Sequence, residues 1–359
     1  MKGYVLSSLL ALAPVALASW AEAEGKDISL STVRGYFLQD EDSTNPSGFD
    51  YINWNFGLLN RTYPTDARFD PDHSATQWQR FERWVSYLNN GCQNDGKTRF
   101  KVLVLGRHGE GWHNAAESFY GTPAWNCYWA VQTGNGTAHW DDPWLTPAGY
   151  SEAFKANTYF RQRFEEHGMP FFDSYYTSPL SRCTVTANVT FADLALPADR
   201  PFSPIVKEGF REGMTVHTCN HRSNATYLRS TLPSLRFEEG FTEFDELWHA
   251  DENETDEHFA HRAKEVLDDV FATDDGAWIS VTAHSGAITQ LLRQLGHRPF
   301  RLSTGQIIPV LVKAEVIDPT PTDDYVSYTP SATCKSPPIT SNAASGCVCT
   351  PTPTPALGL

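Results

Sequence analysis

The sequence predicts a three-layer α/β/α domain with a mostly parallel central sheet. Short apolar runs rich in β-branched residues alternate along the chain with longer amphipathic segments, as strands do when helices join and cover them. Three of the expected strands end directly before short polar segments, at 106–111, 178–182 and 284–286. In open α/β sheets, functional residues gather in the loops that follow strand ends, so one edge of this sheet is the expected site.

The expected elements follow the hydrophobic pattern in chain order. Residues 19 to about 70 are mixed and turn-rich, and an amphipathic helix is expected at 74–90, where apolar side chains recur at helical spacing before Gly91. The apolar run at 101–105 predicts a buried strand. The remaining helices are expected at 150–166, 181–194, 257–271 and 286–295, and the remaining strands at 174–177, 204–207, 278–283 and 307–312.

The composition excludes several functional classes. The chain has 359 residues, of which 40% are hydrophobic and 13% aromatic, which is typical of a folded domain and not of a disordered chain. With 28 basic and 43 acidic residues, the net charge is −15. This charge argues against a general nucleic-acid binder and against electrostatic docking on an anionic membrane. A small anionic substrate remains compatible, because a few arginines can dominate the field inside a pocket.

The first residues predict a secreted protein. Residues 1–18 have a positive charge at Lys2 and then an apolar stretch that is too short to span a membrane, which is typical of a signal peptide. Cleavage is expected after Ala18, with Ala21 and Ala23 as the alternatives. The mature chain would then divide into a single catalytic domain at 19–317 and a tail at 318–359.

The cysteines and glycosylation sequons fit the same compartment. An odd count of seven cysteines leaves at least one unpaired, and the sequence selects none of about 105 patterns with three bridges. Asn188 is the weakest sequon because it lies in an expected helix. The five predicted glycosylation sites are Asn60, Asn135, Asn188, Asn224 and Asn253.

Two further segments have unusual compositions. The Pro/Thr/Ser-rich tail is expected to be mobile and a candidate for O-glycosylation. An insertion near 112–144 is rich in tryptophan, and it either packs over the core or forms an aromatic lid that selects the substrate's leaving group. Its tryptophans are Trp112, Trp125, Trp129, Trp140 and Trp144.

The residues at the three strand ends favour the binding of a phosphoryl group. Arg107 and His108 follow one strand, Arg182 follows another, and His284 follows a third. Two guanidinium groups can each bind phosphoryl oxygens through paired N–H donors. A histidine can attack phosphorus and carry the group covalently, while a second histidine can stabilise the oxygens during transfer.

The order of these motifs resembles the histidine phosphatase (phosphoglycerate mutase-like) superfamily. The matching motifs are Arg107-His108-Gly109-Glu110 with Asn114, Leu145-Thr146-Pro147-Ala148-Gly149, Ser178-Pro179-Leu180-Ser181-Arg182 and Ala283-His284-Ser285-Gly286. Segments at 35–37, 56–58, 125–129 and 211–222 are similar to a fungal and plant phosphomutase-like branch. The resemblance covers roughly 32–316 and implies a phosphoglycerate mutase-like fold.

The resemblance also implies roles for individual catalytic residues. His108 would be the nucleophile, Arg107 and Arg182 would hold the phosphoryl oxygens, and His284 would lie beside them. Glu212 would be the general acid, and Glu208 is the rival for that role. A glutamate acid needs a raised pKa, which burial near other carboxylates could supply.

The resemblance further predicts how the substrate is bound. Asn114, Gly109 and Ser285 would help to bind the phosphoryl group. The family often has a hydroxyl residue where this chain has Gly111, so that hydrogen bond is either missing or supplied by the backbone. Cys183, directly after the second arginine, is expected in the core or in a disulfide.

The expected function is a secreted phosphomonoester hydrolase that works through a phosphohistidine at acidic pH, without a metal or cofactor. Its partner would be a small phosphorylated substrate. The alternatives are a phosphoglycerate mutase-like transferase and an inactive binding glycoprotein of the same fold. A serine hydrolase is disfavoured because Ala283 replaces the first glycine of the Gly-x-Ser-x-Gly motif. A zinc enzyme is disfavoured because His108 and His113 do not have the spacing of zinc ligands. His217 and His221 are interpreted as rim residues.

Overall fold

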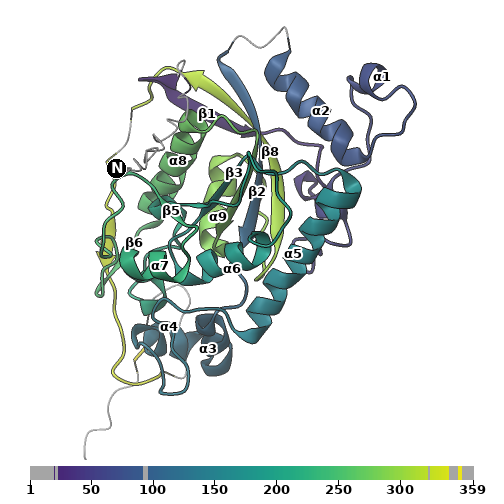
Figure 1. The fold of residues 1–359 in the computed structure, drawn as a ribbon. Coiled ribbons are helices and arrows are strands. Elements are labelled where there is room, and N and C mark those ends of the chain that lie inside the picture. The colour runs from purple at the N-terminus through teal and green to yellow at the C-terminus, as the bar shows by residue number, and fades with distance from the viewer. Residues whose placement is uncertain (1–19, 21–22, 92–95, 322–323, 339–346, 350–359) are drawn as a thin grey trace, which may run out of the picture.

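The computed structural model describes residues 20, 23–91, 96–321, 324–338 and 347–349. The predicted signal peptide at 1–18 and Cys92 lie outside these residues. A central sheet lies between two groups of helices, as Figure 1 shows. The predicted three-layer α/β/α class is therefore confirmed.

The main sheet has seven strands in the order β1-β8-β2-β7-β3-β4-β5. Strands β2, β7, β3, β4 and β5 are parallel, whereas β8 runs antiparallel to both β1 and β2. The strands are β1 (Asp27–Thr32), β2 (Thr98–Arg107), β3 (Ser174–Thr177), β4 (Ile205–Val206), β5 (Arg236–Phe237), β7 (Trp278–Ala283) and β8 (Ile307–Ile317). Strands β6 (Glu252–Glu254) and β9 (Tyr328–Pro330) form a separate antiparallel pair.

The helices cover both faces of this sheet. The helices are α1 (Asp66–Phe69), α2 (Gln77–Asn90), α3 (Trp112–Tyr120), α4 (Thr122–Cys127), α5 (Pro147–His167), α6 (Ser181–Phe191), α7 (Ala225–Thr231), α8 (Asp256–Thr273) and α9 (Ser285–Gln294). Apolar side chains of α8 and α9 form one buried cluster with the sheet, and those of α2, α5 and α6 form a second. Each cluster removes the apolar side of its helices from water, which is the main stabilising term of such a layered fold.

Two predicted strands have the bounds that the structure shows, whereas other predicted elements differ from the structure at their ends. The strands expected at 174–177 and 278–283 have those bounds. Strand β8 continues to Ile317 instead of ending near 312, because β1 pairs with its polar second half. Helix α6 stops at Phe191 instead of Leu194. Strand β1 was not expected, since its alternation of Ser and Thr with apolar residues lies in the turn-rich segment.

The Trp-rich insertion divides into a packed part and an exposed part. Trp125 and Trp140 are buried together with Ala130, and the Trp140 Nε1 donates a hydrogen bond to the carbonyl of Trp129. Trp112 is 39% exposed, although it begins α3. Trp144 is 37% exposed. Packing therefore accounts for Trp125 and Trp140, whereas an aromatic lid stays a prediction for the exposed Trp112 and Trp144.

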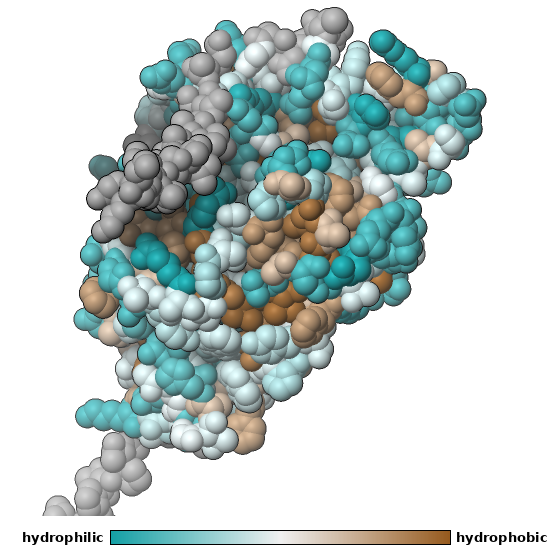
Figure 2. Space-filling view, viewed as in Figure 1, coloured by the Kyte–Doolittle hydropathy of each residue, from teal (hydrophilic) through white to brown (hydrophobic). Residues whose placement is uncertain are grey.

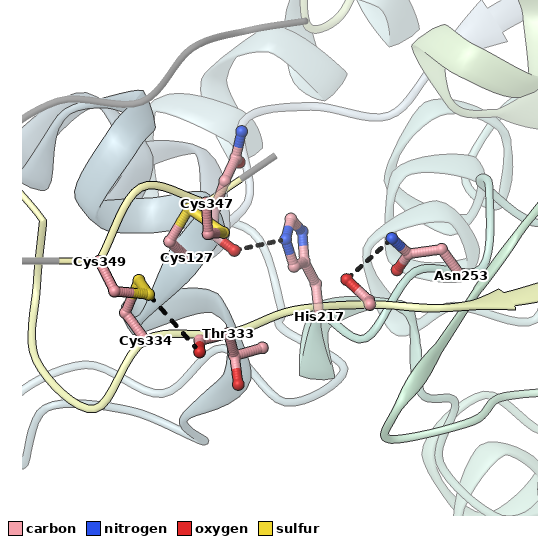
Figure 3. The surroundings of a disulfide bond; sticks show 9 residues. Cys127, His217, Asn253, Thr333, Cys334, Cys347 and Cys349 are labelled. Carbon is pink, nitrogen blue, oxygen red and sulfur yellow. Dashed lines mark hydrogen bonds between the residues drawn. A yellow bond between two sulfur atoms is a disulfide. The ribbon is translucent and has the colours of Figure 1, made fainter. Parts of the chain in front are cut away.

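The described part of the tail is attached to the domain, which corrects the expectation of a mobile tail for these residues. Strand β9 pairs with β6, and two disulfides join Cys127 to Cys347 and Cys334 to Cys349 (Figure 3). A backbone hydrogen bond of 2.8 Å joins Cys334 to Cys127. Strand pairing and disulfide bonds thus fix these tail residues, although the Pro/Thr/Ser-rich composition of the tail alone predicts that they are mobile.

The surface view shows hydrophobic side chains on the face that carries α5 and α6, with hydrophilic side chains around them (Figure 2). Among the described residues, no helix has both the length and the apolar character that crossing a membrane requires.

Replacing Trp140 by Ala should lower the free energy of unfolding by about 3–5 kcal/mol, because a fully buried indole leaves a cavity. Replacing the exposed Trp112 by Ala should cost less than about 1 kcal/mol. Urea unfolding of both variants checks this, and equal losses would contradict the division of the insertion.

Candidate active site

Three neighbouring parallel strands bring the predicted motifs to one edge of the sheet. In the strand register Arg107 lies beside Ala283, and Thr177 lies beside Thr282. The residues that follow are joined by backbone hydrogen bonds, with His108 N donating to the Ala283 carbonyl at 3.0 Å. The ring centroids of His108 and His284 are 5.0 Å apart.

His108 is held as a neutral imidazole with one defined tautomer. Its side chain is buried, and its Nδ1 lies 2.7 Å from the Gly109 carbonyl, which can only accept a hydrogen bond. Nδ1 therefore carries the proton and Nε2 keeps its lone pair. Burial lowers the pKa of His108 well below its usual value, and the positive charges of Arg182 and Arg107 lower it further.

Arg182 is buried and Arg107 is half-buried, and neither forms an ion pair with a carboxylate among the described residues. Arg182 is 1% exposed and donates to the Cys219 carbonyl at 2.7 Å, and Arg107 donates to the Leu302 carbonyl at 2.9 Å. The Nε atoms of both are buried and have no hydrogen-bond partner in the described structure. Burying an unpaired charge is costly, so this arrangement favours an anionic ligand.

His284 lies beside His108 and is fully buried. Its Nε2 is 2.8 Å from the Ser178 hydroxyl and 3.3 Å from the Cys183 sulfur. Burial and the nearby Arg182 lower the pKa of His284 well below its usual value. Cys183 is a free, buried thiol whose pKa is raised by burial, so the structure places it in the core and not in a disulfide.

Glu212 reaches the first turn of α9, directly after His284. Its two carboxylate oxygens accept hydrogen bonds of 3.0 Å from the backbone N–H groups of Gly286 and Ala287. The expectation that other carboxylates surround Glu212 is wrong. The hydrogen-bond partners of its carboxylate are backbone N–H groups at the N-terminus of α9, which is the positive end of the helix dipole. Close approach at Gly286 explains its residue type, since a Cβ there would lie 2.1 Å from the Glu212 Oε1.

Glu208 is engaged elsewhere. It forms ion pairs with Arg211 at 3.1 Å and with Arg222 at 2.5 Å, and both arginine side chains are fully buried. Arg211 is also paired with the buried Asp245 at 2.6 Å. The structure thus leaves Glu212 as the carboxylate that contacts the His284 loop.

The predicted substrate-binding residues have different surroundings. Gly109 donates its N–H to the Thr186 hydroxyl, and a Cβ on Gly109 would lie 2.4 Å from the Gly149 carbonyl oxygen. This glycine therefore makes room for α5, and its role in binding the phosphoryl group stays a prediction. The Asn114 Oδ1 accepts the Gly111 N–H at 3.0 Å and so orders the loop, while Ser285 is half-buried at the start of α9.

His113 also lies at this site, although its spacing from His108 in the sequence was weighed only for a zinc site. The rings of His113 and His108 are 5.5 Å apart, and the His113 Nδ1 is buried without a partner in the described structure. The available signal was its place in the first turn of α3, where side chains point back toward the preceding loop.

The two predicted rim histidines differ from each other. His217 lies against the insertion, with its Nε2 3.2 Å from the Asn126 carbonyl, and burial lowers its pKa to about 4 (Figure 3). His221 is more exposed, and its hydrogen bond to Asp141 raises its pKa.

The sequons also lie in different settings. Asn60 and Asn135 are exposed, whereas Asn188 is half-buried in α6. Asn224 caps α7 with its side-chain oxygen, and the Asn253 Nδ2 donates to the Ser331 hydroxyl at 3.0 Å. Glycosylation stays a prediction at all five.

The chain is similar to known proteins over most of its length. A family model described as "Histidine phosphatase superfamily (branch 1)" matches residues 103–306. A protein of Arthroderma benhamiae named "Probable phosphoglycerate mutase" is 44% identical over 316 residues, which are 88% of this chain and 93% of that protein. The chain belongs to the histidine phosphatase superfamily. Members of this superfamily act on small phosphorylated substrates.

Another relative confirms the resemblance to the fungal branch of this superfamily. "Phosphomutase-like protein 3" of Candida albicans is 34% identical over 287 residues, covering 79% of this chain and 80% of that protein. Among solved structures, phosphoglycerate mutase from Thermus thermophilus is 18% identical and has a TM-score of 0.33, covering 58% of this chain and 91% of that one. The fold assignment rests on the strand order and not on this score.

The buried histidines should make the protein less stable at low pH. The folded pKa values of His108, His113 and His284 lie well below the usual 6.5, so the unfolded chain binds more protons below about pH 6.5. The free energy of unfolding should therefore fall as the pH falls from 7 to 5. Each group contributes at most about 1.4 kcal/mol per pH unit.

Urea unfolding at pH 7 and pH 5 tests this with His284→Asn, which should show a shallower pH dependence than the native chain. His167→Asn is the control, because His167 lies at the far end of α5. An unchanged slope for His284→Asn would contradict the neutral, buried state of His284.

Proposed function

We propose that this protein is a phosphomonoester hydrolase that works through a phosphohistidine at His108. The observation that carries the proposal is the pair of guanidinium groups of Arg107 and Arg182, which form no ion pair and have buried, unpartnered Nε atoms, beside a neutral imidazole. A phosphoryl group would supply the missing negative charge. It would also bring an electrophilic phosphorus to the one ring nitrogen that keeps its lone pair.

The reaction follows from this arrangement in two steps. In the first, the His108 Nε2 attacks phosphorus, the phosphorus–oxygen bond to the leaving group breaks, and Glu212 donates a proton to the departing oxygen. In the second, water attacks the phosphohistidine, the phosphorus–nitrogen bond breaks, and the Glu212 carboxylate accepts the proton of the water. Arg107, Arg182 and His284 stabilise the negative charge on the oxygens in both steps.

The position of Glu212 supports its acid role. Its carboxylate is held by the N–H groups of Gly286 and Ala287 in the first turn of α9, directly after His284. A carboxyl group fixed at this place can exchange a proton with an oxygen of a phosphoryl group bound beside His284.

A mutase is the second candidate, since curated relatives carry mutase names. A mutase must hold a second anionic group of a doubly phosphorylated intermediate. The buried arginines near Glu212 are committed to carboxylates: Arg211 to Asp245, Arg222 to Glu208, and Arg262 to Glu254. Arg301 is the cation that favours the mutase, because it is exposed and its charge acts on Arg107.

Secretion and work at acidic pH are part of the proposal. Two disulfides support an oxidising compartment. The lowered pKa of His108 supports acidic catalysis, because it keeps the nucleophile unprotonated at more acidic pH than an ordinary histidine. An inactive binding protein is disfavoured, since all the catalytic positions carry competent side chains.

The purified native chain should release phosphate from p-nitrophenyl phosphate and from some phosphorylated metabolites. His108→Ala should reduce this release by at least about 10⁴-fold and abolish ³²P labelling of the protein, because no other group carries the phosphoryl. His167→Ala is the control. Interconversion of phosphoglycerates that depends on 2,3-bisphosphoglycerate, with little phosphate release, would favour the mutase.

Glu212→Gln should slow hydrolysis by about 10²–10⁴-fold for alkyl phosphates and much less for p-nitrophenyl phosphate, whose leaving group needs no proton. Glu208→Gln should lower stability without this dependence on the leaving group, since it weakens the ion pairs with Arg211 and Arg222. The reverse pattern would assign the acid to Glu208.

A further inference from the structure

The backbone conformation of Gly111 does not require a glycine. Its φ of −95° and ψ of 162° are open to any residue. A Cβ at this position would lie 2.7 Å from the His113 Nδ1 and 2.8 Å from its Cε1. The imidazole of His113 therefore occupies the space into which a side chain at 111 would extend.

This space adjoins the catalytic groups. The same Cβ position is 3.5 Å from the Arg182 Cδ, and the His113 ring centroid is 5.5 Å from that of His108. The Asn114 side chain already binds the Gly111 N–H, so the backbone at 111 has no free donor. A phosphoryl group on His108 would consequently meet the His113 ring at this side of the site.

The His113 Nδ1 is buried, and no hydrogen-bond partner for it is present in the described structure. Leaving such an atom unsatisfied is costly, and a purely packing side chain would avoid this cost. Burial, followed by the charge of Arg182, lowers the pKa of His113 well below its usual value. The ring is therefore neutral and has one N–H donor and one acceptor nitrogen.

We propose that His113 binds the phosphoryl group by donating a hydrogen bond from its neutral imidazole, in the space that a side chain at position 111 would otherwise fill. This role rests on the proposed phosphoryl-transfer function and deepens it. Gly111 and His113 then act as a matched pair: the glycine admits the ring, and the ring supplies the donor that the glycine lacks. A Cβ on Gly111 would displace the ring and remove that donor.

Three substitutions of His113 separate a donor from a packing residue. His113→Leu keeps the bulk and removes both nitrogens, His113→Asn keeps an amide nitrogen near the Nδ1 position, and His113→Gln keeps one near Nε2. The measurements are the dissociation constant for orthovanadate, kcat/KM for p-nitrophenyl phosphate, and the urea midpoint. His167→Leu is the control histidine, and it should match the native chain in the first two.

His113→Leu should weaken orthovanadate binding and lower kcat/KM by roughly 10–100-fold, as expected for one lost donor to the transferring oxygens. Either Asn or Gln should restore part of both values, and the one that does so identifies the nitrogen. A shift of the urea midpoint with unchanged orthovanadate affinity would overturn the proposal and leave His113 a packing residue.

A double substitution tests the matched pair. Gly111→Ser alone should lose activity and orthovanadate affinity because of the close approach to His113. Gly111→Ser combined with His113→Ala should recover both relative to either single variant, because the serine hydroxyl can replace the donor. Additive losses would contradict the pairing.

These readouts separate the two proposals. Normal phosphate release in the native chain with unchanged His113 variants would reject the role of His113 alone. Absence of phosphate release in the native chain would reject the hydrolase, while orthovanadate affinity would still report on His113.

Discussion

The site depends on two guanidinium groups, of the buried Arg182 and the half-buried Arg107, that form no ion pair with a carboxylate among the described residues. Close by, the same fold pairs each buried arginine with an acid, as Arg211 with Asp245 and Arg262 with Glu254 show. Arg107 and Arg182 are left with backbone carbonyls and unpartnered Nε atoms. Burial, followed by the charge of these arginines, lowers the pKa values of His108, His113 and His284, and the unpaired charge favours an anion beside the two guanidinium groups.

The scaffold holds this charge in place through the order of its strands. Because β2, β7 and β3 are adjacent and parallel, His108, His284 and Arg182 follow their strands at one edge. Glu212 lies in the segment that follows β4, outside these three strands. Arg262 of α8 holds this segment by donating hydrogen bonds to the carbonyls of Gly209, Arg211 and Glu212.

The tail contributes to the same support. Arg262 is paired with Glu254 of β6, and Glu254 also accepts the Met214 N–H. Strand β9 then pairs with β6, the Cys127–Cys347 disulfide attaches the tail to the insertion, and the Cys334–Cys349 disulfide closes a loop within the tail. The segment that carries Glu212 is thus braced by residues far away in sequence.

Much of the fold and of the core of the site could be predicted from the sequence, because strand ends before polar motifs are local signals. His108, Arg107, Arg182 and His284 follow apolar runs whose length and composition indicate strands. The neighbours of Glu212 could not be predicted, since they come from α9, more than 70 residues away. The role proposed for His113 depends on the space beside Gly111, and the attachment of the tail depends on strand and cysteine pairing, none of which has a local pattern.

A crystal structure of the native chain with orthovanadate would show whether His108 and the two arginines bind one anion. We expect vanadium bonded to the His108 Nε2, with its equatorial oxygens bound by Arg107 and Arg182. Vanadate bound at another histidine, or without contact to these two arginines, would contradict it.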